Sequence, residues 1–191
     1  MVANYTNLPK TEGEPLGGAY GIYDPETLNY RDLLISQYSK SYFTPQNSEN
    51  IKNEFFETYI NWMLKSHNVK GFEKFNKACF TNGTRESFEY FYLKHLPTKR
   101  LRLAKGEYFF HQMMKGIHKD YAKFSWLDED PLKKGDFVLI SVPFSDTGNI
   151  PKFINDMLST CDELKIPVML DLAYINLAKG LSLDLNYKCI E

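Results

Sequence analysis

Two apolar runs, DFVLISVPF at 136–144 and IPVMLDLAY at 166–174, constrain the fold of this chain more than any other feature. Each has the length of a strand and is apolar at successive positions, which is typical of a strand buried on both faces. The residues between them predict a helix with Asn149 as its N-cap and Pro151 in its first turn. A strand, a helix and a second strand in this order predict a parallel sheet covered by helices. The expected buried face of the helix consists of Ile154, Met157, Leu158 and Cys161.

The chain before residue 136 continues the same alternation. Apolar residues recur at the spacing of one helix face after Thr84, which predicts an amphipathic helix there. The residues on that face are Phe88, Phe91, Tyr92 and His95. The other expected elements are helices at 48–66, with Ser48 as N-cap, and near 107–117, and strands at 78–80, 100–104 and 121–127. The predicted fold class is therefore α/β with a mostly parallel sheet, in one domain at 48–191.

Residues 1–47 differ from the rest in composition. They are rich in Gly, Pro, Tyr and Asn, and predict an N-terminal loop or arm segment with a short helix near its end. The start of the chain, MVANYTNLPK, lacks the apolar core of a secretory signal, and no run approaches the length that crosses a membrane. The formal net charge of −1 gives no reason to expect nucleic acid or an anionic membrane as a partner.

The cysteines and histidines are widely spaced. The three cysteines form no CxxC pair, so a reduced cytoplasmic protein is the simplest interpretation. The four histidines lack metal-ligand spacing, and we interpret them as surface or core residues rather than as a metal site. The residues concerned are Cys79, Cys161, Cys189, His67, His95, His111 and His118.

Three polar motifs follow predicted strands, at the ends where parallel sheets bind their ligands. They are TNGT at 81–84, VPFSDTG at 142–148 and DLAY at 171–174. A turn with glycine that opens a helix offers free backbone N–H groups and the positive end of the helix dipole. TNGT therefore predicts an anion site, to which Thr84 would add a hydroxyl and Arg85 a charge. The alternative is that Gly83 only makes the turn and Thr84 caps the helix.

Asp171 is an acid within an apolar strand end, where an ionised carboxylate needs a partner. If the chain leaves extended geometry after Asp171, both Asp171 and Tyr174 can reach one ligand. Asp171 could then hold a protonated ring nitrogen through a charge-assisted hydrogen bond, while Tyr174 donates to a phenolate-type oxygen. The alternative is a solvent-exposed Asp171 with Tyr174 in the core.

In order and spacing, TNGT, VPFSDTG and DLAY resemble motifs of the fold-type I pyridoxal phosphate-dependent enzymes, in particular the class I/II aminotransferases. The family motifs are a Gly-Ser/Thr phosphate turn, Asn-Pro-Thr-Gly and Asp-x-x-Tyr, and the resemblance runs from about residue 50 to the C-terminus. It implies a three-layer α/β/α fold, namely the large domain of a PLP-dependent transferase, in incomplete form. It also implies pyridoxal 5′-phosphate as cofactor, an amino acid or keto acid as substrate, and a homodimer.

The resemblance assigns roles to individual residues. Asp171 matches the acid that partners the pyridinium nitrogen and keeps the cofactor an electron sink. Tyr174 matches the tyrosine that contacts the ring oxygen of the cofactor. The phosphate turn aligns with Gly83, Thr84 and Arg85.

Two further positions, Tyr108 and Ser145, match the family motifs less closely. KGEYFF is similar to the family's Pro-x-Tyr-Pro segment, which implies that Tyr108 stacks on the cofactor ring, with Phe109 as the neighbouring choice and a plain core aromatic as the alternative. Ser145 stands where the family has Asn. A serine is shorter and cannot reproduce the amide contact to the ring oxygen, so the tuning of the cofactor would differ.

The family's catalytic lysine forms the Schiff base and moves the α-proton of the substrate. It lies in a Ser-x-Ser-Lys-type segment well after Asp-x-x-Tyr. Here Lys179 and Lys188 follow Asp171, and neither lies in such a segment. We therefore interpret the chain as the N-terminal half of a longer enzyme or a truncated reading frame, inactive as given. A sheet without its remaining strands would have open edges, which predicts dimerisation or edge pairing unlike that of the family.

Other functions remain open at this point. A lyase or decarboxylase of the same fold would leave the same residues. A non-catalytic α/β protein that binds a phosphorylated ligand or a partner chain would also retain the phosphate turn. A Rossmann-like nucleotide-binding domain is disfavoured because no GxGxxG follows the first predicted strand.

Overall fold

The computed structural model describes residues 26, 29–30, 32–33, 47–75, 78–117 and 124–191. The chain divides into two compact units, Met1–Ile51 and Lys52–Glu191. The predicted loop or arm at 1–47 lies almost wholly outside the described residues. All the strands in the described part of the chain belong to the second unit, and the second unit is described below.

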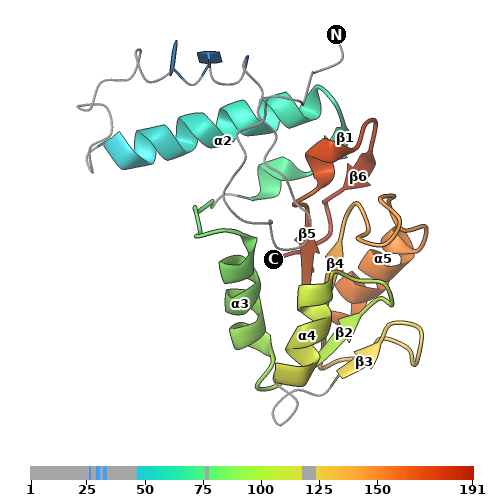
Figure 1. Cartoon of the computed structure of the whole chain (residues 1–191). Coiled ribbons are helices and arrows are strands. Elements are labelled where there is room, and N and C mark those ends of the chain that lie inside the picture. The colour runs from blue at the N-terminus through green and yellow to red at the C-terminus, as the bar shows by residue number, and fades with distance from the viewer. Residues whose placement is uncertain (1–25, 27–28, 31, 34–46, 76–77, 118–123) are drawn as a thin grey trace, which may run out of the picture. The chain divides into compact units, whose positions relative to one another are not determined.

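A four-stranded parallel sheet forms the centre of the second unit, with the strand order β3-β2-β4-β5 (Figure 1). A second sheet pairs two short parallel strands. The strands are β1 (Asn68–Lys70), β2 (Arg100–Leu103), β3 (Phe124–Trp126), β4 (Asp136–Ser141), β5 (Val168–Asp171) and β6 (Ser182–Asp184). The prediction of an α/β fold with parallel strands is confirmed.

The described helices are α2 (Ser48–Leu64), α3 (Thr84–His95), α4 (Phe109–Ile117) and α5 (Ile154–Leu164), with short 3₁₀ turns at Phe72–Lys74 and Ile175–Leu177. No helix in the described part of the chain has the length and apolar character needed to cross a membrane. The helices after Thr84 and after residue 150, and the strands near 100, 124, 136 and 168, lie where the apolar patterns predict them.

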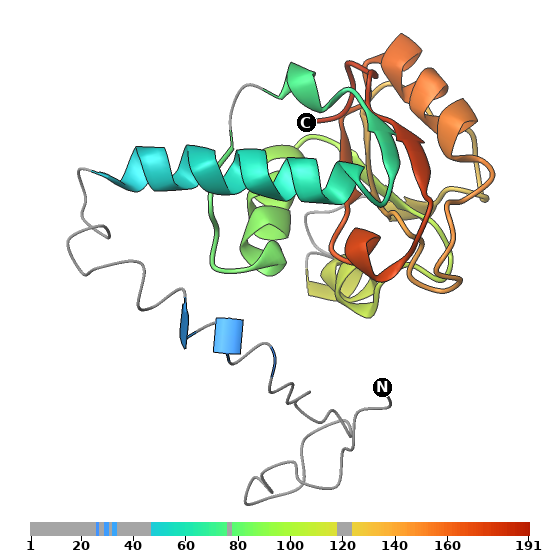
Figure 2. The same cartoon turned by 90° about the horizontal axis from the view of Figure 1, so that it is seen from above.

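β4 is the most deeply buried strand, with all six residues buried. Its side chains alternate between two apolar clusters: Val138 and Ile140 join the cluster that includes α5, while Phe137 and Leu139 join the cluster that includes α3 and α4. Strand side chains point alternately to the two faces of a sheet. α5 therefore covers one face of the sheet and α3 and α4 the other, as Figures 1 and 2 show.

Two predicted local features are wrong. Residues 78–80 form no strand and are exposed, and Phe80 packs against Phe55 and Phe56 with ring centroids 5.2 Å away in both cases. The three-residue run is too short to be told from a loop by its apolar character. Helix α5 begins at Ile154 rather than after Asn149, because the main chain of Asn149 accepts a hydrogen bond from Phe144 N (2.8 Å) and completes a loop.

β5 is an edge strand of the described four-stranded sheet. The chain near Cys189 runs along its start, where Val168 N donates to Cys189 O (2.8 Å) and Glu191 N donates to Val168 O (3.0 Å). Asp171, at the carboxyl end of β5, therefore lies at the border of the sheet.

Candidate functional site

The carboxyl ends of β4 and β5 border a group of buried polar side chains. Asp171 is 8% exposed, and its Oδ2 lies 3.6 Å from Nε2 of His111, which is fully buried on α4. The other ring nitrogen of His111, Nδ1, lies 3.0 Å from the hydroxyl of Tyr92 on α3. Tyr92, His111 and Asp171 thus form a chain that leads from the core to the end of β5.

The protonation state of the Tyr92 hydroxyl bears on which group donates in the hydrogen bond between Tyr92 and His111. Burial raises the pKa of the Tyr92 hydroxyl far above its usual value, and the negative charges of Glu107 and Asp171 raise it further. The hydroxyl therefore keeps its proton and is able to donate a hydrogen bond to Nδ1 of His111. In the neutral tautomer that accepts this hydrogen bond, the imidazole proton is on Nε2 and points towards Asp171. The 3.6 Å separation is longer than a hydrogen bond, and a small movement of the carboxylate would close it.

Glu107 supplies a second buried carboxylate beside this group. It is 2% exposed, and its two oxygens accept hydrogen bonds from the backbone N–H of Ser141 (3.0 Å), from the Ser141 hydroxyl and from Tyr108 N (2.8 Å). Ser141 is in register with Asp171 on the adjacent strand. Glu107 therefore fixes the segment after β2 to the end of β4, next to Asp171.

The chain leaves extended geometry after Asp171, which is the condition under which Asp171 and Tyr174 can reach one ligand. The strand ends at Asp171, and Ala173 N turns back to donate to Asp171 Oδ1 (3.0 Å). Asp171 is buried while Tyr174 is 54% exposed. The alternative of an exposed Asp171 with Tyr174 in the core is therefore wrong.

Ser145 and Tyr174 line one small cavity. Its volume is about 160 Å³, and Pro143, Gly148 and Leu177 are among its other walls. The structure thus brings together the VPFSDTG and DLAY motifs, although Ser145 and Tyr174 lie 29 residues apart in the sequence (174 minus 145).

Tyr108 and Phe109 differ in their surroundings. The Tyr108 ring lies edge-on to the His111 ring, with centroids 5.6 Å apart, whereas Phe109 is 70% exposed. Of the two aromatic residues considered from the sequence, Tyr108 is the one beside the buried polar group.

The predicted phosphate turn opens α3 as expected, although no strand precedes it. Gly83 has a φ of +92° and caps the helix, and Gly83, Thr84 and Arg85 are all exposed. The guanidinium of Arg85 lies 5.0 Å from the centroid of the Phe110 ring on α4. A carboxylate already occupies this turn, because Glu86 Oε2 accepts a hydrogen bond from Asn82 N (2.6 Å).

Four residues of this region were not predicted as site residues: Tyr92, Glu107, His111 and Ser141. Glu107 and His111 are four residues apart, which is the spacing of one helix face. Two ionisable residues on the same face as apolar ones are a sequence signal for a buried polar group. α4 itself begins only at Phe109, so helical periodicity alone would have placed Glu107 wrongly.

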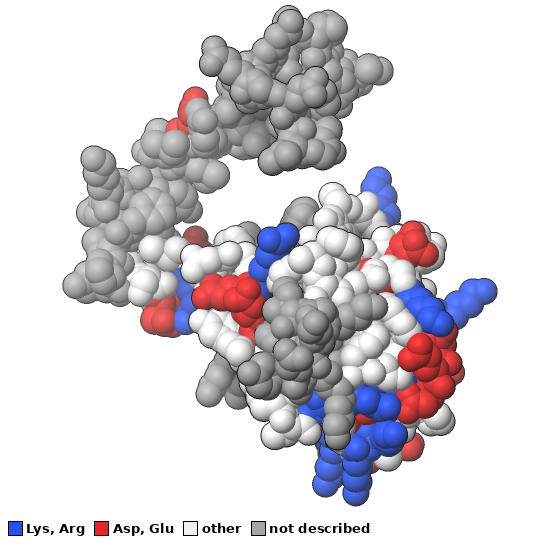
Figure 3. Space-filling model, turned by 60° about the horizontal axis from the view of Figure 1, so that its bottom comes forward, with Lys and Arg blue, Asp and Glu red and all other residues white. Residues whose placement is uncertain are grey.

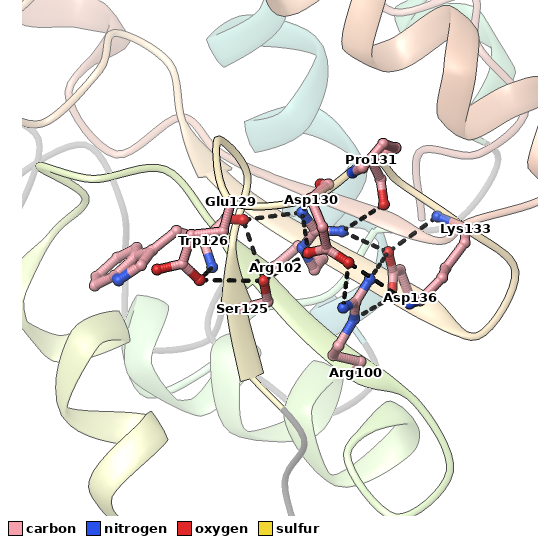
Figure 4. A network of polar contacts seen from close by, with 9 residues as sticks. All are labelled: Arg100, Arg102, Ser125, Trp126, Glu129, Asp130, Pro131, Lys133 and Asp136. Carbon is pink, nitrogen blue, oxygen red and sulfur yellow. Dashed lines mark hydrogen bonds and ion pairs between the residues drawn. The ribbon is translucent and has the colours of Figure 1, made fainter.

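A second polar network is centred on Arg100, Arg102 and Asp136, at the paired starts of β2 and β4 (Figure 4). Arg102 is fully buried and donates to Asp136 Oδ2 (2.8 Å) and to three backbone carbonyls, one at the end of β3 and two in the loop between β3 and β4. Those carbonyls belong to Trp126, Asp130 and Pro131. Arg100 donates to both Asp136 oxygens (2.7 and 3.0 Å). Because these contacts satisfy the charges within the chain, we interpret this network as structural.

The face drawn in Figure 3 carries acidic and basic side chains near one another, around uncharged areas. Comparisons with protein-family models, with curated proteins and with solved structures give no match. The function is therefore argued from the geometry of the buried polar group.

Proposed function

We propose that this domain binds pyridoxal 5′-phosphate and belongs to an aminotransferase-like enzyme that acts on amino acids or related amines. The observation that carries the proposal is the buried Asp171 at the end of β5, backed by His111 and Tyr92. The fold, with parallel strands and helices on both faces, is compatible with it. When bound, the cofactor would supply an electron sink for chemistry at the α-carbon of an amino acid.

The residues at the ring end suit this cofactor. Asp171 and Glu107 are two buried carboxylates, and burying a negative charge is costly unless a cation or hydrogen bonds offset it. Among the described residues, Glu107 receives three hydrogen bonds, whereas the Asp171 carboxylate receives one, from Ala173 N, and lies opposite Nε2 of His111. A protonated ring nitrogen would meet the remaining acceptor capacity of Asp171. His111 would then hold the carboxylate in position from behind.

The phosphate end suits the cofactor less well. Gly83 leaves open space at the start of α3, and Arg85 adds a cation there. However, the Glu86 carboxylate lies at this turn, and like charges repel. Hydrogen bonds from the backbone and the side chains around it also hold the pKa of Glu86 below its usual value, so that it is ionised at neutral pH. A phosphate at this turn would have to displace Glu86.

We also propose that catalysis needs a Schiff-base lysine. Neither Lys179 nor Lys188 lies in the family's Ser-x-Ser-Lys-type segment, so a single adduct on one of them would make it an unorthodox Schiff-base lysine. Lys188 lines a cavity with Lys99 and Pro167, and Pro167 precedes β5 at the other end of the strand from Asp171. Lys179 is exposed and follows Ala178, which lines the cavity beside Tyr174. The homodimer and the reducing cytoplasmic setting belong to this proposal, and the three free cysteines support the second of these.

A second candidate function is a non-catalytic domain that binds a ring-containing phosphorylated ligand. Among the described residues, no lysine lines the cavity of Ser145 and Tyr174, which favours binding without covalent chemistry. The two candidates share Asp171 and differ in whether a lysine reacts.

One experiment tests both candidates. The purified chain is titrated with pyridoxal 5′-phosphate, reduced with borohydride, and mapped for lysine adducts by peptide mass. The same titration on Asp171→Asn should show binding weakened by roughly ten- to a hundredfold, the range of a charge-assisted hydrogen bond. Asp184→Asn, at an exposed position on β6, is the matched control and should bind as the parent does.

The pattern of adducts separates the outcomes. Saturable binding that needs Asp171, with one adduct that Lys179→Arg removes and Lys188→Arg keeps, supports the enzyme-like pocket. Saturable binding that needs Asp171 without an adduct supports the non-catalytic candidate. Binding insensitive to Asp171→Asn, or adducts scattered over many lysines, contradicts both.

A further inference from the structure

A larger cavity lies on the α5 side of the sheet, outside the group around Asp171. Its volume is about 580 Å³, and it is bordered by the residues after β2 and β3, by the loop to β4 and by α5. This volume falls in the range of small-molecule sites, roughly 300 to 1,000 Å³. It also lies at the carboxyl ends of two parallel strands, where α/β sheets bind ligands. It shares one wall residue, Phe144, with the small cavity of Ser145 and Tyr174.

The wall of this cavity is mainly apolar. Phe144 and Met157 are buried, and Phe153, at the start of α5, is 43% exposed. These side chains come from the segment after β4 and from α5, and would enclose an apolar body by dispersion and by the release of water. The apolar wall residues are Leu127, Pro131, Leu132, Phe144, Phe153 and Met157.

The charged side chains that line the cavity include more carboxylates than cations. Lys105 and Asp128 form an ion pair (2.9 Å) and neutralise each other, which raises the pKa of Lys105 and lowers that of Asp128. Asp156 adds a further carboxylate, and no cation within 4.0 Å of it is found among the described residues. Thr160 donates its hydroxyl proton to the Asp156 carbonyl (2.9 Å), which leaves its oxygen as an acceptor. The lining therefore has a net charge of −1 and spare acceptors.

We propose that this cavity binds a small amine, with its apolar body against Phe144 and Met157 and its protonated amino group at Asp156. The apolar wall and the uncompensated carboxylate together select a cation with an apolar body over a neutral or anionic molecule of the same size. The proposal is independent of cofactor binding at Asp171, because none of its polar residues belongs to that group.

The test uses the purified chain labelled with ¹³C at its methionine methyl groups. Met157→Leu identifies the Met157 signal among the six methionines. Tryptamine is the probe, and tryptophol, which carries a hydroxyl in place of the amine, is its neutral counterpart. We expect tryptamine to shift the Met157 signal and to bind about two- to fivefold more tightly than tryptophol, the range of an exposed ion pair.

Substitutions on α5 test whether Asp156 causes the preference for tryptamine over tryptophol. Asp156→Asn should abolish the preference for tryptamine while tryptophol binds as before. Glu163→Gln, an exposed position on the same helix outside the cavity, makes the same change in charge and should keep the preference. Equal affinity for the two probes, a preference that survives Asp156→Asn, or an unmoved Met157 signal at millimolar probe would each overturn the proposal. The last result is also the one expected if another part of the chain or a protein partner fills the cavity.

Discussion

Replacing Asp136 with asparagine removes the carboxylate on which two arginines converge. Asp136 is 1% exposed, and its oxygens accept hydrogen bonds from Arg100 Nε (2.7 Å), Arg100 Nη2 (3.0 Å), Arg102 Nη1 (2.8 Å) and Lys133 N (3.1 Å). Asparagine has nearly the same size, so the packing around position 136 is kept. The change therefore isolates the loss of charge and of acceptor capacity.

The expected cost follows from the burial of Arg102. Removing one partner of a buried ion pair leaves the other charge uncompensated and costs about 3 to 5 kcal/mol. Asparagine retains one acceptor oxygen, and Arg100 is 15% exposed and also bonds to Asp130. We therefore expect the lower end, about 3 kcal/mol. A loss of this size is a large part of the roughly 5 to 15 kcal/mol by which domains are usually stable.

Urea unfolding followed by circular dichroism measures the free energy of unfolding of each variant. The control is Asp128→Asn, which makes the same chemical change in the exposed pair with Lys105 and should cost only a small fraction of the Asp136 loss. If Asp136→Asn does not fold, Arg100→Lys serves as the milder change, with a smaller loss expected. Equal losses for Asp136→Asn and Asp128→Asn would refute the reasoning.

The same carboxylate gives a pH dependence. Burial acts to raise the pKa of Asp136, but the hydrogen bonds from Arg100, Lys133 N and Arg102 outweigh it and hold the pKa below 3.8. A carboxyl group with a lowered pKa in the folded state stabilises the fold above its unfolded pKa, and this contribution is lost as the pH falls through the folded value. The difference in stability between the parent and Asp136→Asn should therefore be constant from pH 7 to about pH 5 and shrink below about pH 4. A difference that grows with acidity would contradict the assignment.

Two further results are expected. Burial raises the pKa of Cys161 to about 12 and that of Cys189 to about 11. Ellman's reagent should therefore modify only the exposed Cys79 in the native chain, and all three thiols in urea. Rapid reaction of two or more thiols in the native chain would contradict this. Gly106→Ala should lower the free energy of unfolding in urea more than Gly135→Ala does. Both glycines have φ near +90°, so an alanine at either position costs about 1 to 2 kcal/mol in backbone strain. Of the two, only at Gly106 would the added Cβ lie 2.9 Å from a neighbouring side chain, which adds to the cost.

The four strands of the larger sheet and the main helices could be predicted because burial determines them, whereas the three-residue strands β1 and β6 were not predicted. β4 and β5 come from long apolar runs, and the buried face of α5 consists of the four residues that its spacing indicated. Asp171 could be singled out for the same reason, since an acid inside an apolar run is conspicuous. Patterns of this kind depend on the sequence within one element.

Tertiary contacts explain what the sequence did not predict. The run at 78–80 resembles a strand, but Phe80 finds its ring partners on α2 rather than in the sheet. Asn149 suits an N-cap, yet its carbonyl is bonded to Phe144 N and delays the helix. His111 approaches Asp171 from a separate element, and no local spacing indicates that approach.

The buried guanidinium of Arg102 also affects the cavity beside α5. It binds the carbonyls of Trp126, Asp130 and Pro131, and the segment they span supplies part of the cavity wall. A wall that is already fixed in the free protein loses little conformational entropy when a ligand arrives. The segment is thus already ordered by folding, before a ligand binds. A substitution at Arg102 would remove this order and so lower the affinity of the cavity for a ligand that Arg102 itself does not contact.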